Sequence, residues 1–188
     1  MPSPATPSSQ APRRHSPWLE PADFGGNEEV FKTHGYDLWL QADDEALVVE
    51  FDIRSRLEGL ARPPNLDSAL MELYLDLRPP PRLGAPGYEA GVEQFFLYLG
   101  DDVIKSKSER TYHIDYQRRP TANGIRVRAR LPYADFLPAG APPPTRFGLD
   151  CMMIVCNAAG QCLGHPTYGR RQGLWSSPKL FARAFRAK

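Results

Sequence analysis

Two acidic residues, Glu72 and Asp76, stand on one side of the stretch "SALMELYLDLRP" and are the first candidates for acid–base chemistry. Apolar and polar residues alternate through this stretch, which predicts a β-strand within residues 68–79. At a strand rise of about 3.3 Å per residue, the two carboxylates lie roughly 13 Å apart. Paired carboxylates of glycosidases lie about 5 to 9.5 Å apart. The spacing therefore argues against a catalytic acid pair.

The two faces of this predicted strand differ in character. Its apolar face carries Met71, Leu73, Leu75 and Leu77, and its polar face carries Glu72, Tyr74, Asp76 and Arg78. Successive side chains of a strand point to opposite sides. We therefore expect a dry face in the core and a wet face toward solvent.

Three cysteines, Cys151, Cys156 and Cys162, precede His165 and raise the question of a metal site. Cys151 and Cys156 differ by an odd number of positions, so on a strand they face opposite sides, which argues against shared zinc ligation. Small buried side chains are the favoured interpretation. A disulfide between Cys156 and Cys162 is the alternative in an oxidising compartment.

Other catalytic patterns are weak or absent. His113 and Asp115 share a strand face, but the sequence places no serine or cysteine beside them, so no catalytic triad is predicted. The P-loop, the dinucleotide fingerprint and G-x-S-x-G are all missing. We therefore expect a protein that is not an enzyme.

Composition and charge narrow the class of protein. The 188 residues, 41% of them hydrophobic, suit one globular domain, and the net charge of +1 gives no reason to expect nucleic acid or an anionic membrane as partner. No apolar run is long enough to cross a bilayer. We expect residues 1–17, rich in Pro and Ser, to be a disordered tail and residues 18–188 to form the domain. The tail lacks the apolar segment of a secretory signal, which predicts a cytoplasmic protein.

Short alternating segments separated by turn residues run along the rest of the chain. They are "YDLWLQAD" and "ALVVEFDIRS" as a hairpin, then residues 68–79, "VEQFFLYLG", "GIRVRARLPYADF", "RFGLDCMMIVCNAAG" and "KLFARAFRA", with shorter candidates in "DVIKSKSE" and "TYHIDYQ". The stretch "RPPPRLGAPGYEAG" must be a long loop, because its prolines lack the backbone N–H that donates hydrogen bonds in a sheet and its glycines favour turns. No stretch has sustained helical periodicity, so the pattern predicts an all-β, antiparallel β-sandwich with about eight to ten strands in a single domain.

The order of these segments resembles the family 9 carbohydrate-binding modules (CBM9) and their superfamily, which includes the DOMON domains. The resemblance spans residues 37–186 and rests on "MELYLDLRP", "YEAGVEQFFLYLG", "GIRVRARLPYADF", "FGLDCMMIVCNAAG" and "GLWSSPKLFARAFR". It implies a jelly-roll-like β-sandwich that binds a sugar or a glycan end without catalysis, with aromatic rings and polar side chains as contacts. Members of the family are more often extracellular or periplasmic.

Site residues follow from the resemblance position by position. They are Trp175 and Tyr88 as sugar platforms and Glu72, Asp76, Arg78 and Gln94 as polar contacts. Trp175 equally suits a structural cover for the end of the sandwich, and the polar residues suit a solvated face with cross-strand ion pairs. Trp39 is interpreted as a core residue. Glu93 and Gln94 face opposite sides, so only one of them joins this surface.

Cofactors and competing functions remain open at this point. Asn157 stands where the family commonly has Asp, and no cluster of acidic residues forms a calcium loop, so no cofactor is predicted and calcium lacks a clear motif. A haem-binding DOMON-type domain would need a Met ligand such as Met71, which suits the core better. A protein-interaction module is the second alternative, and the basic stripe Arg126, Arg128 and Arg130 would serve an acidic partner unless Glu50 and Asp52 neutralise it. The oligomeric state is left undetermined.

Overall fold

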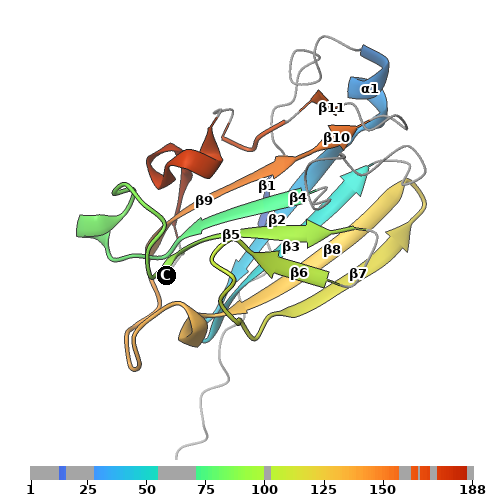
Figure 1. Cartoon of the computed structure of the whole chain (residues 1–188). Helices are drawn as coiled ribbons and strands as arrows, with labels where there is room; N and C mark the ends of the chain where they lie inside the picture. The colour runs from blue at the N-terminus through green and yellow to red at the C-terminus, as the bar shows by residue number, and fades with distance from the viewer. Residues whose placement is uncertain are drawn as a thin grey trace, which may run out of the picture.

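The structure is a computed structural model that describes residues 13–15, 28–54, 71–99, 103–156, 162–164, 166–169 and 173–185. Two five-stranded sheets face each other as a sandwich (Figure 1), and every strand pairing within them is antiparallel. The predicted all-β, antiparallel β-sandwich is therefore confirmed.

The first sheet has the strand order β1-β2-β3-β8-β7. Its strands are β1 (Arg13–His15), β2 (Gly35–Ala42), β3 (Ala46–Arg54), β8 (Gly124–Pro132) and β7 (Asp115–Thr121). The predicted hairpin is β2–β3, and Asp43 closes its turn by accepting hydrogen bonds from the backbone N–H groups of Glu45 and Ala46 at 2.8 and 2.7 Å. An Asp side chain in this role stabilises a tight turn.

The second sheet has the order β12-β9-β4-β5-β6. Its strands are β12 (Ala182–Phe185), β9 (Arg146–Met153), β4 (Met71–Asp76), β5 (Val92–Tyr98) and β6 (Val103–Ser106). Nine strands of the sandwich have four residues or more, within the predicted range, and the three shorter ones are β1 and the separate pair β10 (Val155–Cys156) and β11 (Cys162–Gly164). One short helix, α1 (Glu28–Thr33), was not predicted because six residues carry too little periodicity.

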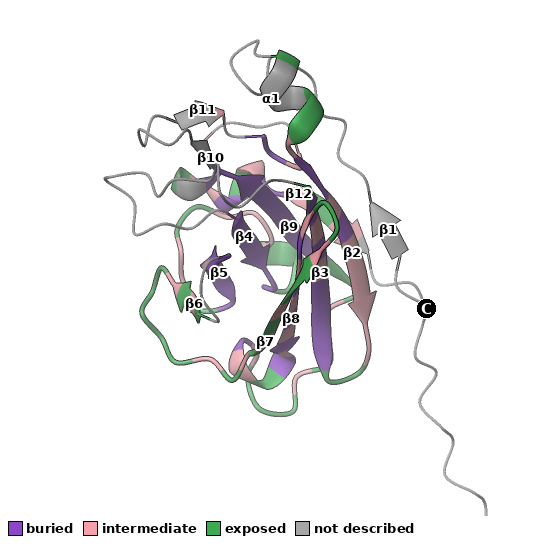
Figure 2. Cartoon of the chain, turned by 90° about the vertical axis from the view of Figure 1, so that its right-hand side faces the viewer, coloured by how far each residue is buried: buried purple, intermediate pink, exposed green. Residues whose placement is uncertain are grey.

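The main core lies between the two sheets. Alternate residues of β3, β4 and β8 point into it, and Phe51, Leu73 and Val127 are fully buried. Figure 2 shows the buried inner strands in purple, while the edge strands β6 and β7 are more exposed. Met71 belongs to this core, as the sequence analysis favoured.

Strand β4 departs from the prediction of one dry and one wet face. All six of its residues are buried, and so are Leu77 and Arg78 that follow it. The outer face is covered by a second apolar cluster, in which Tyr74 packs with Phe181 and Leu174. The expected solvated face is therefore wrong, because segments far along the chain shield it from water.

Part of the expected N-terminal tail lies in the described residues. Arg13–His15 form an edge strand that pairs with Leu38 to Leu40 of β2. The other residues of the expected tail, 1–12 and 16–17, lie outside the described residues. Among the described residues, no helix is long and apolar enough to cross a membrane.

Two of the three arginines in the basic stripe on β8 have close acidic partners. Arg126 lies opposite Asp52 and pairs with it at 2.6 Å, and Arg130 pairs with Glu45 at 3.0 Å. Arg128 has a looser ion pair, with Asp115 at 3.7 Å. The stripe is therefore neutralised in part, at Arg126 and Arg130.

Candidate functional site

The outer face of the second sheet brings most of the predicted site residues together. Register across the strands places Met152, Glu72, Phe96 and Lys105 in one row and Asp150, Tyr74 and Gln94 in the next. Residues directly opposite each other in antiparallel strands share a face. We call this surface the Glu72 face, defined by these two rows.

A hydrogen-bonded trio lies at the centre of the Glu72 face. The Tyr74 hydroxyl donates to Glu72 Oε2, and Gln94 Nε2 donates to the same oxygen at 2.9 Å. All three side chains are almost fully buried. Both hydrogen bonds end on the same carboxylate oxygen of Glu72. The other oxygen, Oε1, receives no hydrogen bond from the described residues.

Gln94 also carries an acceptor that its surroundings leave unused. Its side-chain Oε1 is buried and has no hydrogen-bond partner in the described part of the chain. A buried acceptor without a partner costs free energy, roughly 1 to 3 kcal/mol, unless a ligand or water supplies a donor. Two acceptors of the Glu72 face, Glu72 Oε1 and Gln94 Oε1, therefore have no donor among the described residues.

Burial changes the acid–base behaviour of this trio. Desolvation raises the pKa of Glu72 above 4.5, and hydrogen bonds from Tyr74 and Gln94 oppose part of that rise. Desolvation and the adjacent Glu72 carboxylate together raise the pKa of the Tyr74 hydroxyl, so Tyr74 stays a hydrogen-bond donor at neutral pH. The trio thus keeps a defined donor and acceptor pattern.

Aromatic side chains border the trio on one side. Tyr74 and Phe181 have ring centroids 5.5 Å apart, and Tyr88 meets Phe181 edge to face at 6.3 Å. The Tyr88 hydroxyl donates to the Leu174 carbonyl at 2.9 Å, and Lys107 Nζ lies 4.3 Å from the Tyr88 ring centroid. Tyr88, predicted in the loop, is therefore half-buried against this aromatic group.

Trp175 enters the same region through its backbone. It lies in the 3-10 helix η5 (Leu174–Ser176), directly after the carbonyl that Tyr88 binds. The side chain of Trp175 lies outside the described residues. Asp150 ties this segment to the sheet, because its carboxylate accepts hydrogen bonds from the backbone N–H groups of Gly169 and Ala182. A second 3-10 helix, η6 (Pro178–Leu180), follows, and Ser177 caps it by accepting from Lys179 N–H.

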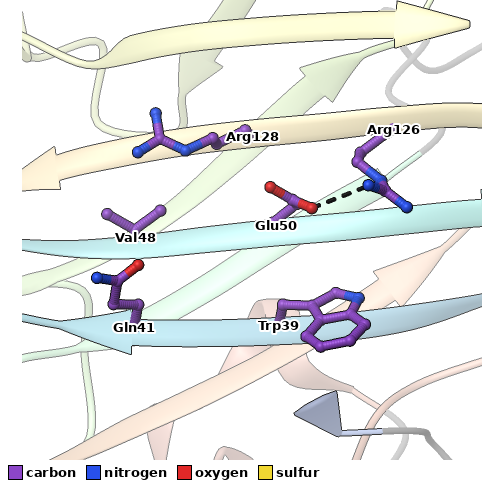
Figure 3. A pocket seen from close by; sticks show the side chains of 6 residues that line it. All are labelled: Trp39, Gln41, Val48, Glu50, Arg126 and Arg128. Atoms are coloured by element: carbon purple, nitrogen blue, oxygen red, sulfur yellow. Dashed lines mark ion pairs between the residues drawn. The ribbon is translucent and has the colours of Figure 1, made fainter. Parts of the chain in front are cut away.

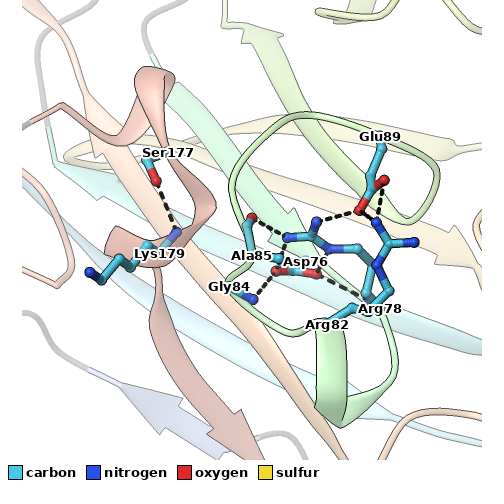
Figure 4. A network of polar contacts seen from close by, with 8 residues as sticks. All are labelled: Asp76, Arg78, Arg82, Gly84, Ala85, Glu89, Ser177 and Lys179. Atoms are coloured by element: carbon cyan, nitrogen blue, oxygen red, sulfur yellow. Dashed lines mark hydrogen bonds and ion pairs between the residues drawn. The ribbon is translucent and has the colours of Figure 1, made fainter.

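Asp76 and Arg78 lie at one end of the Glu72 face and bind each other (Figure 4). The Asp76 carboxylate accepts two hydrogen bonds from the Arg78 guanidinium, at 2.9 and 2.8 Å, and one from Gly84 N–H at 2.7 Å. Arg78 also donates to Glu89 and to the Ala85 carbonyl. The hydrogen bonds that Arg78 donates to Asp76 raise the pKa of the Arg78 guanidinium, and desolvation opposes part of that rise.

This ion-pair network holds the loop that carries Tyr88. The loop is irregular as predicted, apart from one turn of 3-10 helix, η3 (Pro80–Arg82). Gly84 adopts φ +78° where it binds Asp76, a conformation that suits glycine. Arg82 pairs with Glu89 on the exposed side. Asp76 and Arg78 therefore spend most of their hydrogen-bonding capacity inside the protein.

The structure also tests two predictions about side-chain orientation, one for Glu93 and Gln94 and one for Trp39. Glu93 and Gln94 do face opposite sides: Glu93 points the other way and accepts hydrogen bonds from Ser108 and Tyr112. Trp39 is not a core residue. It lies half-buried on the outer face of the first sheet, on the side opposite Leu38.

Five members of the Glu72 face were not among the predicted site residues: Tyr74, Phe96, Lys105, Asp150 and Met152. Tyr74 was placed on the polar face but given no role. Phe96 lies two positions after Gln94, so strand alternation alone would have placed both on one face. Lys107, which borders the face, lies in the turn directly after β6, where its N–H donates to the Gln94 carbonyl at 2.8 Å, and no local pattern predicts that contact.

The candidate metal and haem ligands of the described part of the chain lie in different surroundings. No group of three or more His, Cys, Asp or Glu side chains there could hold a metal ion. His113 is exposed and pairs with Asp135 at 3.0 Å, and Met153 lies in the main core. Cys151 is a buried free thiol. The side chains of Cys156 and Cys162, and all of His165 and Asn157, lie outside the described residues.

Comparison with known proteins gives matches in structure but not in sequence. No family model and no curated protein matches the chain. Two solved structures of a family 9 carbohydrate-binding module from Caldicellulosiruptor kristjanssonii, one in complex with cellotriose and one with glucose, match with a TM-score of 0.63 and 15% sequence identity. The first match covers 80% of this chain and 73% of the module, and the second covers 82% and 78%. The chain therefore has a CBM9-like β-sandwich fold.

Proposed function

We propose that this protein is a non-catalytic carbohydrate-binding domain that holds a sugar or a glycan end on the Glu72 face. The observation that carries the proposal is a pair of acceptor oxygens, Glu72 Oε1 and Gln94 Oε1, that receive no hydrogen bond from the described residues. They lie beside a group of aromatic rings. Sugar hydroxyls donate to such acceptors, while aromatic rings cover the apolar face of a pyranose. The fold shared with modules in complex with cellotriose and glucose supports the same ligand class.

The predicted site residues divide into two roles in this proposal. Glu72, Gln94, Tyr88 and Trp175 contact the sugar, with Phe96 as an added aromatic contact. Asp76 and Arg78 act as positioning residues, because their hydrogen bonds hold the loop that presents Tyr88. We expect no cofactor to be required, calcium included.

Binding of cellotriose and glucose, measured by isothermal titration calorimetry, tests the proposal. We expect Gln94→Ala and Trp175→Ala each to weaken binding by about tenfold or more, since each removes a hydrogen bond or an aromatic contact worth roughly 1 to 2 kcal/mol. Gln117→Ala, on the exposed edge strand β7, is the matched control and should bind as the unaltered protein does.

Three outcomes would overturn the proposal. The folded protein could bind neither sugar nor any glycan on an array, or Gln94→Ala and Trp175→Ala could both bind with unchanged affinity. Cellotriose could instead be cleaved during incubation, which would contradict the non-catalytic role. A chelator added to the titration tests the expectation about calcium separately, and we expect it to leave the affinity unchanged.

A further inference from the structure

A hollow lies on the outer face of the first sheet, on the opposite side of the molecule from the Glu72 face (Figure 3). Six side chains from three adjacent strands line it: Trp39 and Gln41 from β2, Val48 and Glu50 from β3, and Arg126 and Arg128 from β8. They occupy alternate positions of each strand, so all six point to the same side. We call this surface the Trp39 hollow. The proposed sugar site, on the other sheet, shares no residue with it.

Two apolar side chains, Val48 and Trp39, are among those that line the Trp39 hollow. Val48 is 8% exposed although it points away from the core, and Trp39 is half-buried. Across the β2–β3 pair, Val48 lies opposite Gln41 and Trp39 lies opposite Glu50. Trp39, Glu50 and Arg128 are aligned across the three strands by their register. A flat aromatic surface next to polar groups suits a ring-shaped ligand.

The two arginines of the hollow differ in how far neighbouring carboxylates satisfy them. Arg126 donates to Asp52 at 2.6 Å and pairs with Glu50 at 3.5 Å. Arg128 makes one loose ion pair, with Asp115 at 3.7 Å, and no hydrogen bond to any described residue. The Arg128 guanidinium therefore keeps its donors for a carboxylate, which it can bind in a two-pronged geometry.

Two further groups suit the hydroxyl groups of a ligand. The Gln41 amide makes no hydrogen bond within the described part of the chain and offers both a donor and an acceptor. The Glu50 carboxylate is held in place by Arg126 and accepts from hydroxyls. A ligand for this hollow should thus combine a ring, hydroxyl groups and one carboxylate.

We propose that the Trp39 hollow is a second binding site, which takes an acidic sugar of the uronic acid class. The carboxylate pairs with Arg128, the hydroxyls meet Gln41 and Glu50, and the sugar ring lies against Trp39. This site is independent of the proposed function on the Glu72 face, so either can fail without the other.

Titration of trigalacturonic acid against the whole protein tests this site, with cellotriose as the neutral trisaccharide of equal length. We expect Arg128→Gln to weaken binding of trigalacturonic acid by about tenfold, the loss of one charge-assisted contact. Gln41→Ala should weaken it less, and added salt should weaken it in the unaltered protein. Arg110→Gln, at an exposed arginine between β6 and β7 that does not line the hollow, is the matched control and should leave binding unchanged.

Variants of the Glu72 face separate the two sites. Trp175→Ala should leave the affinity for trigalacturonic acid as it is, even where it abolishes binding of cellotriose. Absence of binding by the folded protein would overturn the second site. So would an affinity that falls with Trp175→Ala but not with Arg128→Gln, because the acidic sugar would then occupy the Glu72 face.

Discussion

At the scale of single residues, folding changes the surroundings of Glu72 strongly. Its carboxylate is taken out of water, and the two donors that reach it, on Tyr74 and Gln94, share one oxygen. The raised pKa of Glu72 means that the folded protein holds its proton more tightly than the unfolded chain does.

The sign of the pH effect follows from that raised pKa. Between pH 4.5 and the raised value, the folded state keeps a proton that the unfolded state has released, so Glu72 makes the free energy of unfolding fall as pH rises. Glu72→Gln has no carboxyl group at this position, so we expect it to escape this fall in the free energy of unfolding. Its stability minus that of the unaltered protein should rise between pH 4.5 and the raised pKa of Glu72 and then stay level. Chemical denaturation at a series of pH values between pH 4 and pH 8 measures this difference.

Glu45→Gln serves as the control for that series, because the Glu45 side chain is 82% exposed and pairs with Arg130 on the surface. Its stability difference from the unaltered protein should change little over the same range. A difference for Glu72→Gln that stays constant with pH would contradict the assigned cause.

At the scale of elements, β4 and the loop after it act as one unit. Asp76 at the end of β4 and Arg78 in the loop are both buried, and their pair reaches Gly84 and Glu89. Breaking a buried ion pair leaves one charge without its partner, which is much more costly than losing an exposed pair. The position of Tyr88 over the Glu72 face therefore depends on Asp76.

Asp76→Ala tests this dependence. We expect it to lower the free energy of unfolding by about 3 to 5 kcal/mol, since the buried Arg78 guanidinium loses its main acceptor. Arg82→Ala, which removes an exposed arginine from the same network, should change stability little. Chemical denaturation of both variants measures the difference, and equal losses would show that the network does not hold the loop.

At the scale of the whole molecule, the second sheet has apolar packing on both sides. Leu73 and Leu75 face the main core, while Tyr74, between them, faces the second cluster with Phe181. A sheet covered on both faces is expected to unfold together with the layers on either side of it. The C-terminal segment is therefore part of the folding unit.

Phe181→Ala should lower the free energy of unfolding by about 3 to 5 kcal/mol, because it empties the centre of the second cluster. Val103→Ala, at an exposed apolar position on β6, is the control and should have a small effect. Denaturation followed by both tryptophan fluorescence and far-ultraviolet circular dichroism should give a single coincident transition. Two separate transitions would mean that the second cluster folds independently.

Several features of the fold were accessible from the sequence because they are local. Alternation with a period of two predicted the strands, the β2–β3 hairpin and the opposite orientation of Glu93 and Gln94. The pairing of Arg126 with Asp52 followed from the same pattern once β3 and β8 were placed side by side. Alternation also carried the signal that Trp39 shares a side with Gln41 rather than with Leu38, and that signal was overlooked.

The sequence by itself determined the all-β class, most of the strands and the side of each strand on which a residue lies, since all of these depend on neighbours one or two positions away. Only the tertiary structure decided that the polar side of β4 is buried, because its cover comes from Leu174 and Phe181, about a hundred residues further along the chain. The same long-range packing leaves Gln94 Oε1 buried without a partner among the described residues and brings Tyr88 to the Leu174 carbonyl. Alternation says which way a side chain points, but it carries no information about which distant segment will lie against it.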